Sequence, residues 1–224
     1  TLDKILLRRD MTSTIGKELL KRLMGTTTPV QKVPVEKLNQ YTDKNHQGAI
    51  AFLSPIDFCS LETLVPTLFE EGKTPLLMVL DGVTDVRNFG AIARTCACAG
   101  ANALIIGSHG SVAINGDAVK TSAGALYHLP VCKVDNLQHA LQFLRDSGFM
   151  VLAATEHATA NYTEVDMTMP TAIVMGSEEK GIYEGNLRIC SHQVRIPMSG
   201  VIESLNVSVA AGVMLYEAVR QRGC

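Results

Sequence analysis

The sequence predicts an α/β protein in which a parallel β-sheet is covered by helices on both faces and is preceded by a smaller α/β unit. Apolar runs of strand length alternate with helical patterns along the chain, which is typical of this class. Most of these runs are continuously apolar, as expected for strands that are buried on both faces of a sheet. With 224 residues, 46% of them hydrophobic, the chain can bury a full core in one domain or in one large and one small domain.

The strands that we predict are short apolar stretches, in chain order residues 4–7, 48–53, 75–80, 103–107, 129–134, 149–155, 171–176 and 192–197. The helices that we predict cover residues 14–24, 60–71, 88–99, 135–147 and 205–222. Turn-forming residues lie at both ends of the stretch 54–74. We therefore expect a small N-terminal domain over residues 1–54, a linker over 55–74 and the main domain over 75–224.

The last predicted helix is apolar on every side. From Val207 to Val219 nearly every position is apolar or small, so the helix has no polar face to turn toward water. A helix of this kind is expected to be buried all round. At the C-terminus of a chain of this size, that requires a wrapped loop or a second subunit over its outer face, and we predict a homodimer with this helix at or near the interface.

The composition argues against several classes of protein. Six cysteines are scattered without a C-x-x-C pair, and six histidines show no H-x-x-x-H pair, which argues against zinc and favours reduced thiols in a cytosolic protein. No run of 18 apolar residues occurs, so no membrane span is predicted. Residues 1–30 carry charges throughout, so no secretory signal is predicted either.

The charges are distributed unevenly, although the net charge is only −2. Residues 1–46 carry nine Lys or Arg against five Asp or Glu, whereas the remainder carries 11 against 17. A basic recognition segment joined to a neutral or acidic catalytic body would have this distribution. A solvated surface could also produce it by chance.

The first candidate segment is residues 79–95, where a strand and a loop lead into a helix that we expect to open near Asn88. A Rossmann dinucleotide site needs G-x-G-x-x-G directly after the strand, and only Gly82 and Gly90 occur here, which disfavours a nicotinamide dehydrogenase. Asn88 and Arg94 are six residues apart and hence roughly on one side of the helix. Two simpler roles stay open, a helix N-cap for Asn88 and a solvated or ion-paired arginine for Arg94.

Two further segments follow predicted strands. Residues 173–182, IVMGSEEKGI, form a loop bracketed by two glycines, which allow a ligand to approach the backbone, and no Lys-Ser/Thr follows them as in a Walker loop. Residues 196–206, IPMSGVIESLN, place a polar Ser-Leu-Asn directly before the buried C-terminal helix. A surface turn and a helix N-cap are the simpler interpretations. However, three loops at the carboxyl ends of parallel strands lie where α/β proteins bind ligands.

The three segments together resemble the motifs of the SpoU/TrmH family, RNA ribose 2′-O-methyltransferases of the SPOUT superfamily. The motifs are N-x-G-x-x-x-R (Asn88 to Arg94), G-x-E-x-x-G (Gly176 to Gly181) and I-P-M-x-G-x-x-x-S-L-N-V-S-V-A (residues 196–210), in the family's order and spacing. The resemblance extends from about residue 46 to residue 222. It implies a trefoil knot near the C-terminus of the main domain and an S-adenosylmethionine cofactor bound there in a bent form.

The resemblance also implies roles for single residues. The adenosine of the cofactor would rest on backbone groups of Gly176, Ile196 and Leu205, with Thr155 and Met198 nearby. Arg94 would correspond to the family's catalytic arginine, as a base or as an electrostatic stabiliser of the developing alkoxide. The remaining catalytic candidates are Asn88, Glu178, Ser204 and Asn206, of which the last two would also cap the helix.

The expected substrate is RNA. HQGAIA (residues 46–51) and DGVTDVRNFGA (residues 81–91) resemble the enzymes that methylate a guanosine ribose in 23S ribosomal RNA, with transfer RNA enzymes as the alternative. An adenosine-modifying resistance enzyme and a non-enzymatic RNA-binding module stay open as well.

The resemblance implies that the chain opens at the second strand of the family's N-terminal domain. With few aromatic residues, we expect RNA backbone contacts rather than base stacking to dominate, with Arg8, Arg9, Lys17, Arg22, Arg87 and Lys120 as candidates.

Overall fold

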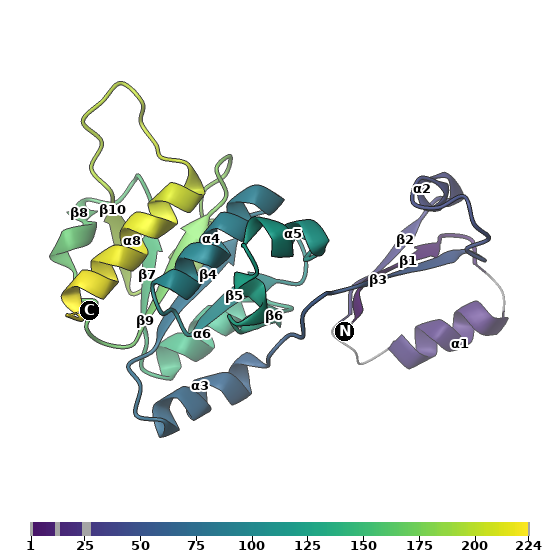
Figure 1. Ribbon diagram of the computed structural model, residues 1–224, viewed down its shortest axis with the longest axis horizontal. Coiled ribbons are helices and arrows are strands. Elements are labelled where there is room, and N and C mark those ends of the chain that lie inside the picture. Colours follow the sequence, from purple (N-terminus) through teal and green to yellow (C-terminus); the bar gives the residue numbers. More distant parts are fainter. Residues whose placement is uncertain (1, 12–13, 24–27, 224) are drawn as a thin grey trace. The chain divides into compact units, whose positions relative to one another are not determined.

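The computed structural model describes residues 2–11, 14–23 and 28–223 of the chain, which divides into two units at Pro55 and Ile56 (Figure 1). Within the described residues no helix is long and apolar enough to cross a membrane. Each unit has its own hydrophobic core.

The N-terminal unit is a three-stranded sheet with two helices. Its elements are β1 (Leu2–Arg8), α1 (Thr14–Leu23), β2 (Val30–Val33), α2 (Val35–Asn39) and β3 (Ala49–Leu53). β1 lies in the middle, parallel to β2 and antiparallel to β3. Both predicted strands and the predicted helix are confirmed, although residue 24 of that helix lies outside the described residues. β2 and α2 were not predicted, since β2 reads VQKV with only Val33 buried and α2 has five residues.

The larger unit is built on a seven-stranded sheet with the order β6-β5-β4-β9-β7-β10-β8. Its strands are β4 (Leu76–Asp81), β5 (Ala103–Gly107), β6 (Val131–Val134), β7 (Met150–Ala154), β8 (Ala160–Asn161), β9 (Thr171–Gly176) and β10 (His192–Arg195). Every neighbouring pair is parallel, as predicted from the continuously apolar runs. Only β8, which has two residues, was not predicted.

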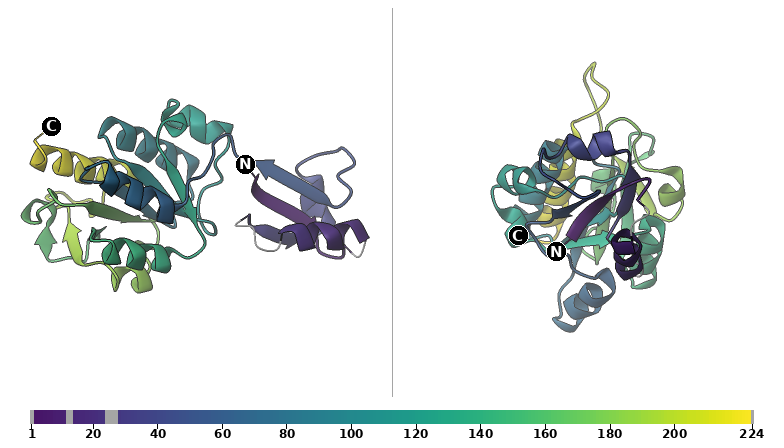
Figure 2. Two further views of the ribbon diagram at one scale, coloured as in Figure 1. Left: turned by 90° about the horizontal axis from the view of Figure 1, so that it is seen from below. Right: turned by 90° about the vertical axis from the view of Figure 1, so that its right-hand side faces the viewer.

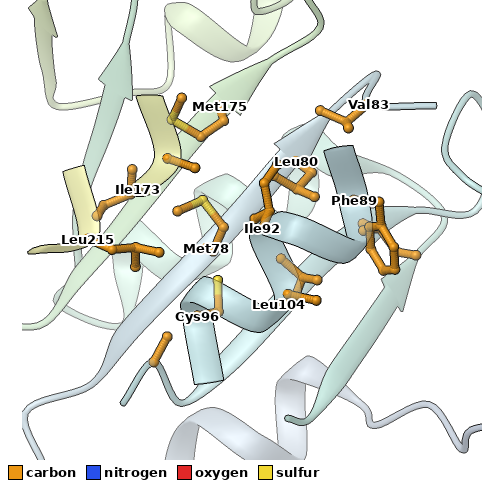
Figure 3. Packing of buried hydrophobic residues seen from close by; sticks show 14 of the residues in the cluster. Met78, Leu80, Val83, Phe89, Ile92, Cys96, Leu104, Ile173, Met175 and Leu215 are labelled. Carbon is orange, nitrogen blue, oxygen red and sulfur yellow. The ribbon is translucent and has the colours of Figure 1, made fainter. Parts of the chain in front are cut away.

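Helices cover both faces of this sheet, which confirms the predicted layers (Figure 2). The helices are α3 (Leu61–Glu70), α4 (Val86–Cys98), α5 (Gly116–Thr121), α6 (Leu137–Asp146), α7 (Glu184–Leu187) and α8 (Val207–Gln221), with 3₁₀ turns η1 (Ala125–Tyr127) and η2 (Tyr162–Glu164). Side chains alternate along each strand, so Met78 of β4 faces α4 and α8 while Leu77 faces α3 and α6. Figure 3 shows Ile92 and Cys96 of α4 with Leu215 of α8 against the first of these faces.

The segment 55–74, expected to be a linker, contains α3 and packs with the larger unit. Leu61, Val65 and Leu68 of α3 are buried in the core that also holds Leu77 and Val79 of β4. The sequence pattern did predict a helix here. The flanking turn residues mark the ends of that helix rather than a free connection, so the linker is corrected to a packed element.

Helix α8 is not buried on all sides within this chain, contrary to the expectation from its composition. Val209 and Tyr216 are each 51% exposed, and with Gly212 and Val213 they follow the i, i+3, i+4, i+7 spacing of one helix face. The opposite face, with Ala211, Met214, Leu215 and Ala218, is fully buried. The outer face is therefore an uncovered apolar strip, and the homodimer stays a prediction.

The two cysteines of α4 differ in their burial. Cys96 is buried, whereas Cys98 is exposed. Burial raises the pKa of the Cys96 and Cys132 thiols to about 12, so both are un-ionised at neutral pH. The described cysteines are all free thiols, and Cys224 lies outside the described residues.

Candidate functional site

The site begins with a pocket at the carboxyl ends of β7, β9 and β10, which are adjacent in the sheet. Its volume is about 570 Å³, within the range that holds a small molecule of cofactor size. The five residues expected to hold the cofactor, Thr155, Gly176, Ile196, Met198 and Leu205, all line this pocket. The structure thus brings together segments that lie up to 50 residues apart in sequence.

The loop after β9 forms one wall of the pocket because it folds back on the end of the strand. Ser177 and Gly181 exchange two backbone hydrogen bonds of 2.9 and 3.1 Å, and Gly181 has φ +64°, a conformation that favours glycine. A Cβ atom at Gly176 would collide with the backbone of Gly181 and Ile182. Both glycines of this motif are therefore required by the backbone, and the loop is more than a plain surface turn.

Asn206 links the three motifs at the start of α8. Its Nδ2 donates to Asn88 Oδ1 at 2.9 Å and to Glu178 Oε1 at 2.6 Å. Its Oδ1 accepts from the backbone N–H of Ser208 at 3.0 Å, so the same side chain is the N-cap of α8. Glu178 also accepts from the backbone N–H of Val207 at 3.2 Å, which places a carboxylate at the positive end of the helix. One amide thus caps the helix and joins α4 to the loop after β9.

Two of the expected capping roles need correction. Helix α4 begins at Val86, and its N-cap is Asp85, which accepts from the backbone N–H of Asn88 at 2.8 Å. Asn88 lies in the first turn instead, with its side chain directed to Asn206. Ser204 likewise does not cap α8, because the helix begins at Val207, and it lines the pocket instead.

Arg94 lies on the exposed side of α4, about two turns after Arg87. Within the described part of the chain it has no hydrogen-bond or ion-pair partner, so it is a solvated arginine in this structure. Among the described residues, its side chain makes no hydrogen bond to the Asn88–Asn206–Glu178 cluster. Of the five catalytic candidates, the structure joins three, places Ser204 on the pocket wall and leaves Arg94 on the outer face of the same helix as Asn88.

Asp81, which the sequence analysis missed, fixes the far end of the loop after β9. Its Oδ2 accepts from the backbone N–H of Tyr183 at 2.7 Å and from Nδ2 of Asn186, which is buried, at 2.8 Å. Burial, with a smaller contribution from Asp81, raises the pKa of the Cys190 thiol to about 12. A carboxylate at the end of a buried parallel strand is the sequence signal that could have identified Asp81.

Further pocket-lining residues also escaped the sequence analysis. Glu156 and His157 follow β7, and Glu203 precedes the Ser-Leu-Asn motif. Among the described residues, no group of three or more His, Cys, Asp or Glu side chains is arranged to hold a metal ion.

A family model described as the SpoU rRNA Methylase family matches residues 75–216, more than half of the chain. The chain belongs to this family. A putative TrmH family tRNA/rRNA methyltransferase of Staphylococcus saprophyticus is 34% identical to this SpoU/TrmH member over 222 residues, which cover 99% of this chain and 89% of the relative.

Solved structures of SpoU enzymes have the same fold. The SpoU methyltransferase AviRb from Streptomyces viridochromogenes, crystallised with AdoMet, is 26% identical with a TM-score of 0.67 and aligns over 99% of this chain and 83% of its own. An enzyme described as an RNA 2′-O ribose methyltransferase is 26% identical with a TM-score of 0.62, over 99% of this chain and 82% of its own. The trefoil knot implied by the resemblance stays a prediction for this SpoU/TrmH member.

Changing Asn206 to Asp is expected to separate its two tasks. The new carboxyl group keeps an oxygen for the Ser208 N–H but puts its other oxygen where Nδ2 lies, 2.6 Å from Glu178 Oε1. Two carboxylates at that distance repel, so activity should fall about 100-fold at pH 8 and recover partly as the pH is lowered and one of them takes a proton. The measurement is methyl transfer against pH.

The matched control is Asn136→Asp, at the N-cap of α6, where the side chain accepts from the His139 N–H. Aspartate and asparagine are about equally good N-cap residues, so this variant should have the same activity and pH dependence as the wild type. An Asn206→Asp variant with full activity across the pH range would contradict the linking role of the amide.

Proposed function

We propose that this protein transfers a methyl group from S-adenosylmethionine to a ribose 2′-hydroxyl of RNA, with a guanosine in 23S ribosomal RNA as the substrate. The observation that carries the proposal is the pocket at the ends of β7, β9 and β10, with the Asn88–Asn206–Glu178 cluster at its edge. AviRb, which has the same fold, was crystallised with AdoMet.

The residues of the pocket fit the proposed cofactor. The close approach of the loop backbone to Gly176 leaves a wall of peptide groups, which can bind the edge of an adenine, and Ile196, Leu205 and Ala210 supply apolar surface for its ring. Thr155 and Met198 complete the wall. When bound, S-adenosylmethionine supplies an electrophilic methyl group on a positively charged sulfur.

The task of the protein is then to position and activate a ribose hydroxyl, which is a weak nucleophile. Arg94 is a permanent cation, so in this proposal it stabilises the negative charge that develops on the 2′-oxygen rather than taking its proton. Asn206, held by Asn88 and Glu178, fixes the start of α8 and thus the shape of the pocket. Ser204, on the pocket wall, completes the catalytic set.

The substrate assignment rests on the resemblance of residues 46–51 and 81–91 to the 23S guanosine enzymes. A tRNA guanosine is the alternative, and the relative from Staphylococcus saprophyticus is named for both kinds of RNA. In the N-terminal unit, Arg9 and Lys17 are exposed candidates for RNA phosphates, whereas Arg8 and Arg22 are paired with Asp10 and Glu18.

The decisive experiment is methyl transfer from labelled S-adenosylmethionine to unmodified 23S and tRNA transcripts, followed by mapping of the modified nucleotide. Label on one guanosine ribose of 23S RNA is the expected result. Label on tRNA would favour the alternative, and label on a base or on neither RNA would overturn the proposal.

We also propose that a second copy of the chain covers the apolar strip of α8. Val209, Val213 and Tyr216 lie on that strip, and burying such surfaces drives association. Light scattering should give a dimer mass at micromolar concentration, and Tyr216→Arg should shift the protein toward the monomer. A monomer mass for the wild type would overturn the dimer.

A further inference from the structure

The arginines of the larger unit fall into two groups. In the first group, the side chain donates hydrogen bonds to a carboxylate, a glutamine side chain or backbone carbonyls; these are Arg145, Arg188, Arg220 and Arg222. Arg87, Arg94 and Arg195 have no hydrogen-bond or ion-pair partner within the described ranges. Two of these three unpaired cations lie on one helix, α4, in a unit that carries more acidic than basic residues. Their charges are therefore available to a ligand.

Arg87 and Arg94 lie on the same side of α4, because seven residues make nearly two turns. Gly90 lies between them, and a Cβ atom there would be 2.6 Å from Cβ of Thr121 in α5. Helix α5 is thus packed directly beside this side of α4. Lys120, the residue before Thr121, is exposed, and its side chain has no partner among the described residues.

Tyr127 lies at the end of η1, which packs against both α4 and α5. Its side chain is 62% exposed, whereas its neighbour Leu126 is buried in the core and anchors the turn. The backbone before it is tightly defined, with φ +52° at Ala123 and +83° at Gly124, and the Tyr127 N–H donates to the Gly124 carbonyl at 3.0 Å. A large aromatic ring is therefore exposed on a turn that packs against the two helices that carry these cations.

We propose that Arg87, Lys120 and Tyr127 form a contact surface for a single-stranded segment of the RNA substrate. This inference rests on the proposed function. The two cations bind phosphates, and the tyrosine ring stacks on an unpaired base near the methylated nucleotide, a combination typical of proteins that hold single strands. Arg94 lies two turns further along α4 on the same side as Arg87, so RNA held on this surface also reaches the proposed catalytic arginine.

The test is binding of a fluorescein-labelled single-stranded RNA of mixed sequence, measured by anisotropy with the full chain. Tyr127→Ala should weaken binding about 5- to 50-fold, and Tyr127→Phe, which keeps the ring, should restore it to within about twofold. Arg87→Gln and Lys120→Gln should each lower the slope of log affinity against log salt by about 0.7. The control is Arg145→Gln, which removes one positive charge from α6 in the opposite layer, and its salt slope should match the wild type.

The outcomes separate this surface from the proposed function. If the wild type methylates RNA but Tyr127→Ala binds the single strand as tightly as the wild type, the surface is overturned and the proposed function stands. If the wild type methylates no RNA but loses single-strand binding with Tyr127→Ala and regains it with Tyr127→Phe, the surface is supported and the reaction is overturned. Loss of binding that Tyr127→Phe does not restore would overturn stacking, and a wild type that binds no RNA would overturn both.

Discussion

Replacing Arg94 by alanine should lower the rate of methyl transfer by about 10²- to 10³-fold, the usual loss when one preorganised charge is removed from a developing oxyanion. Binding of S-adenosylmethionine should change by less than about twofold, because Arg94 is not among the pocket-lining residues. The fold should not change either, since the side chain is exposed and has no partner among the described residues. The variant thus separates chemistry from cofactor binding.

The measurement is single-turnover methyl transfer together with calorimetric titration of the cofactor. Arg188→Ala is the matched control, because it removes an exposed arginine whose partner is Glu184, the first residue of the short helix that Arg188 follows, and its turnover should be unchanged. Arg94→Lys keeps a charge but loses the planar guanidinium, so an intermediate rate is expected. Full turnover by Arg94→Ala would remove Arg94 from the catalytic set.

Gly176→Ala should abolish cofactor binding, with at least about a 100-fold loss of affinity, because the new methyl group overlaps the backbone of Gly181 and Ile182. The loop 177–182 must then move away from β9, and that loop is a wall of the pocket. Overpacking of this kind also costs about 1–3 kcal/mol of folding free energy. Both effects have the same cause, because the structure leaves no room for a side chain on the Cα atom of residue 176.

Gly116→Ala is the control for Gly176→Ala. Gly116 is the first residue of α5, no heavy atom lies within 4 Å of the position that an added methyl group would take, and its φ is not positive. Alanine there should leave cofactor affinity unchanged and raise the melting temperature slightly through helix propensity. Equal cofactor affinity in the Gly176→Ala variant and the wild type would show that the pocket is not where the cofactor binds.

The sequence predicted the strands of the larger unit well because burial on both faces leaves a continuous apolar run, as in LLMVL of β4. It missed elements without such a signal: β8 has two residues, and α5 and α7 have six and four. These elements are defined by their neighbours rather than by their own periodicity. Helix boundaries differed by about two residues, as at Asp85, where the capping side chain decides the start of α4.

The candidate site was predictable only at the level of motifs. Loops after parallel strands must meet at one edge of the sheet, so the grouping of Gly176, Ile196 and Leu205 was accessible. The contact between Asn88 and Asn206 spans 118 residues and depends on how α8 lies against α4, which no local pattern encodes. The exposure of Tyr127 also depends on tertiary packing. Tyrosine is intermediate in its tendency to be buried, so the sequence alone does not show whether this ring faces the core or water.

The position of β9 has a consequence for how the protein is made. β9 lies between β4 and β7, and in the described sheet β7 pairs with β9 and β10, both of which come later in the chain. During synthesis, β4, β5 and β6 can pair as soon as they leave the ribosome, but β7 emerges before either of its partners. Until residues 171–176 have been synthesised, β7 is an apolar segment whose backbone N–H and C=O groups have no strand to pair with. A ribosome that pauses between β7 and β9 would therefore expose an apolar strand with unpaired backbone groups, and such a strand favours aggregation of the nascent chain.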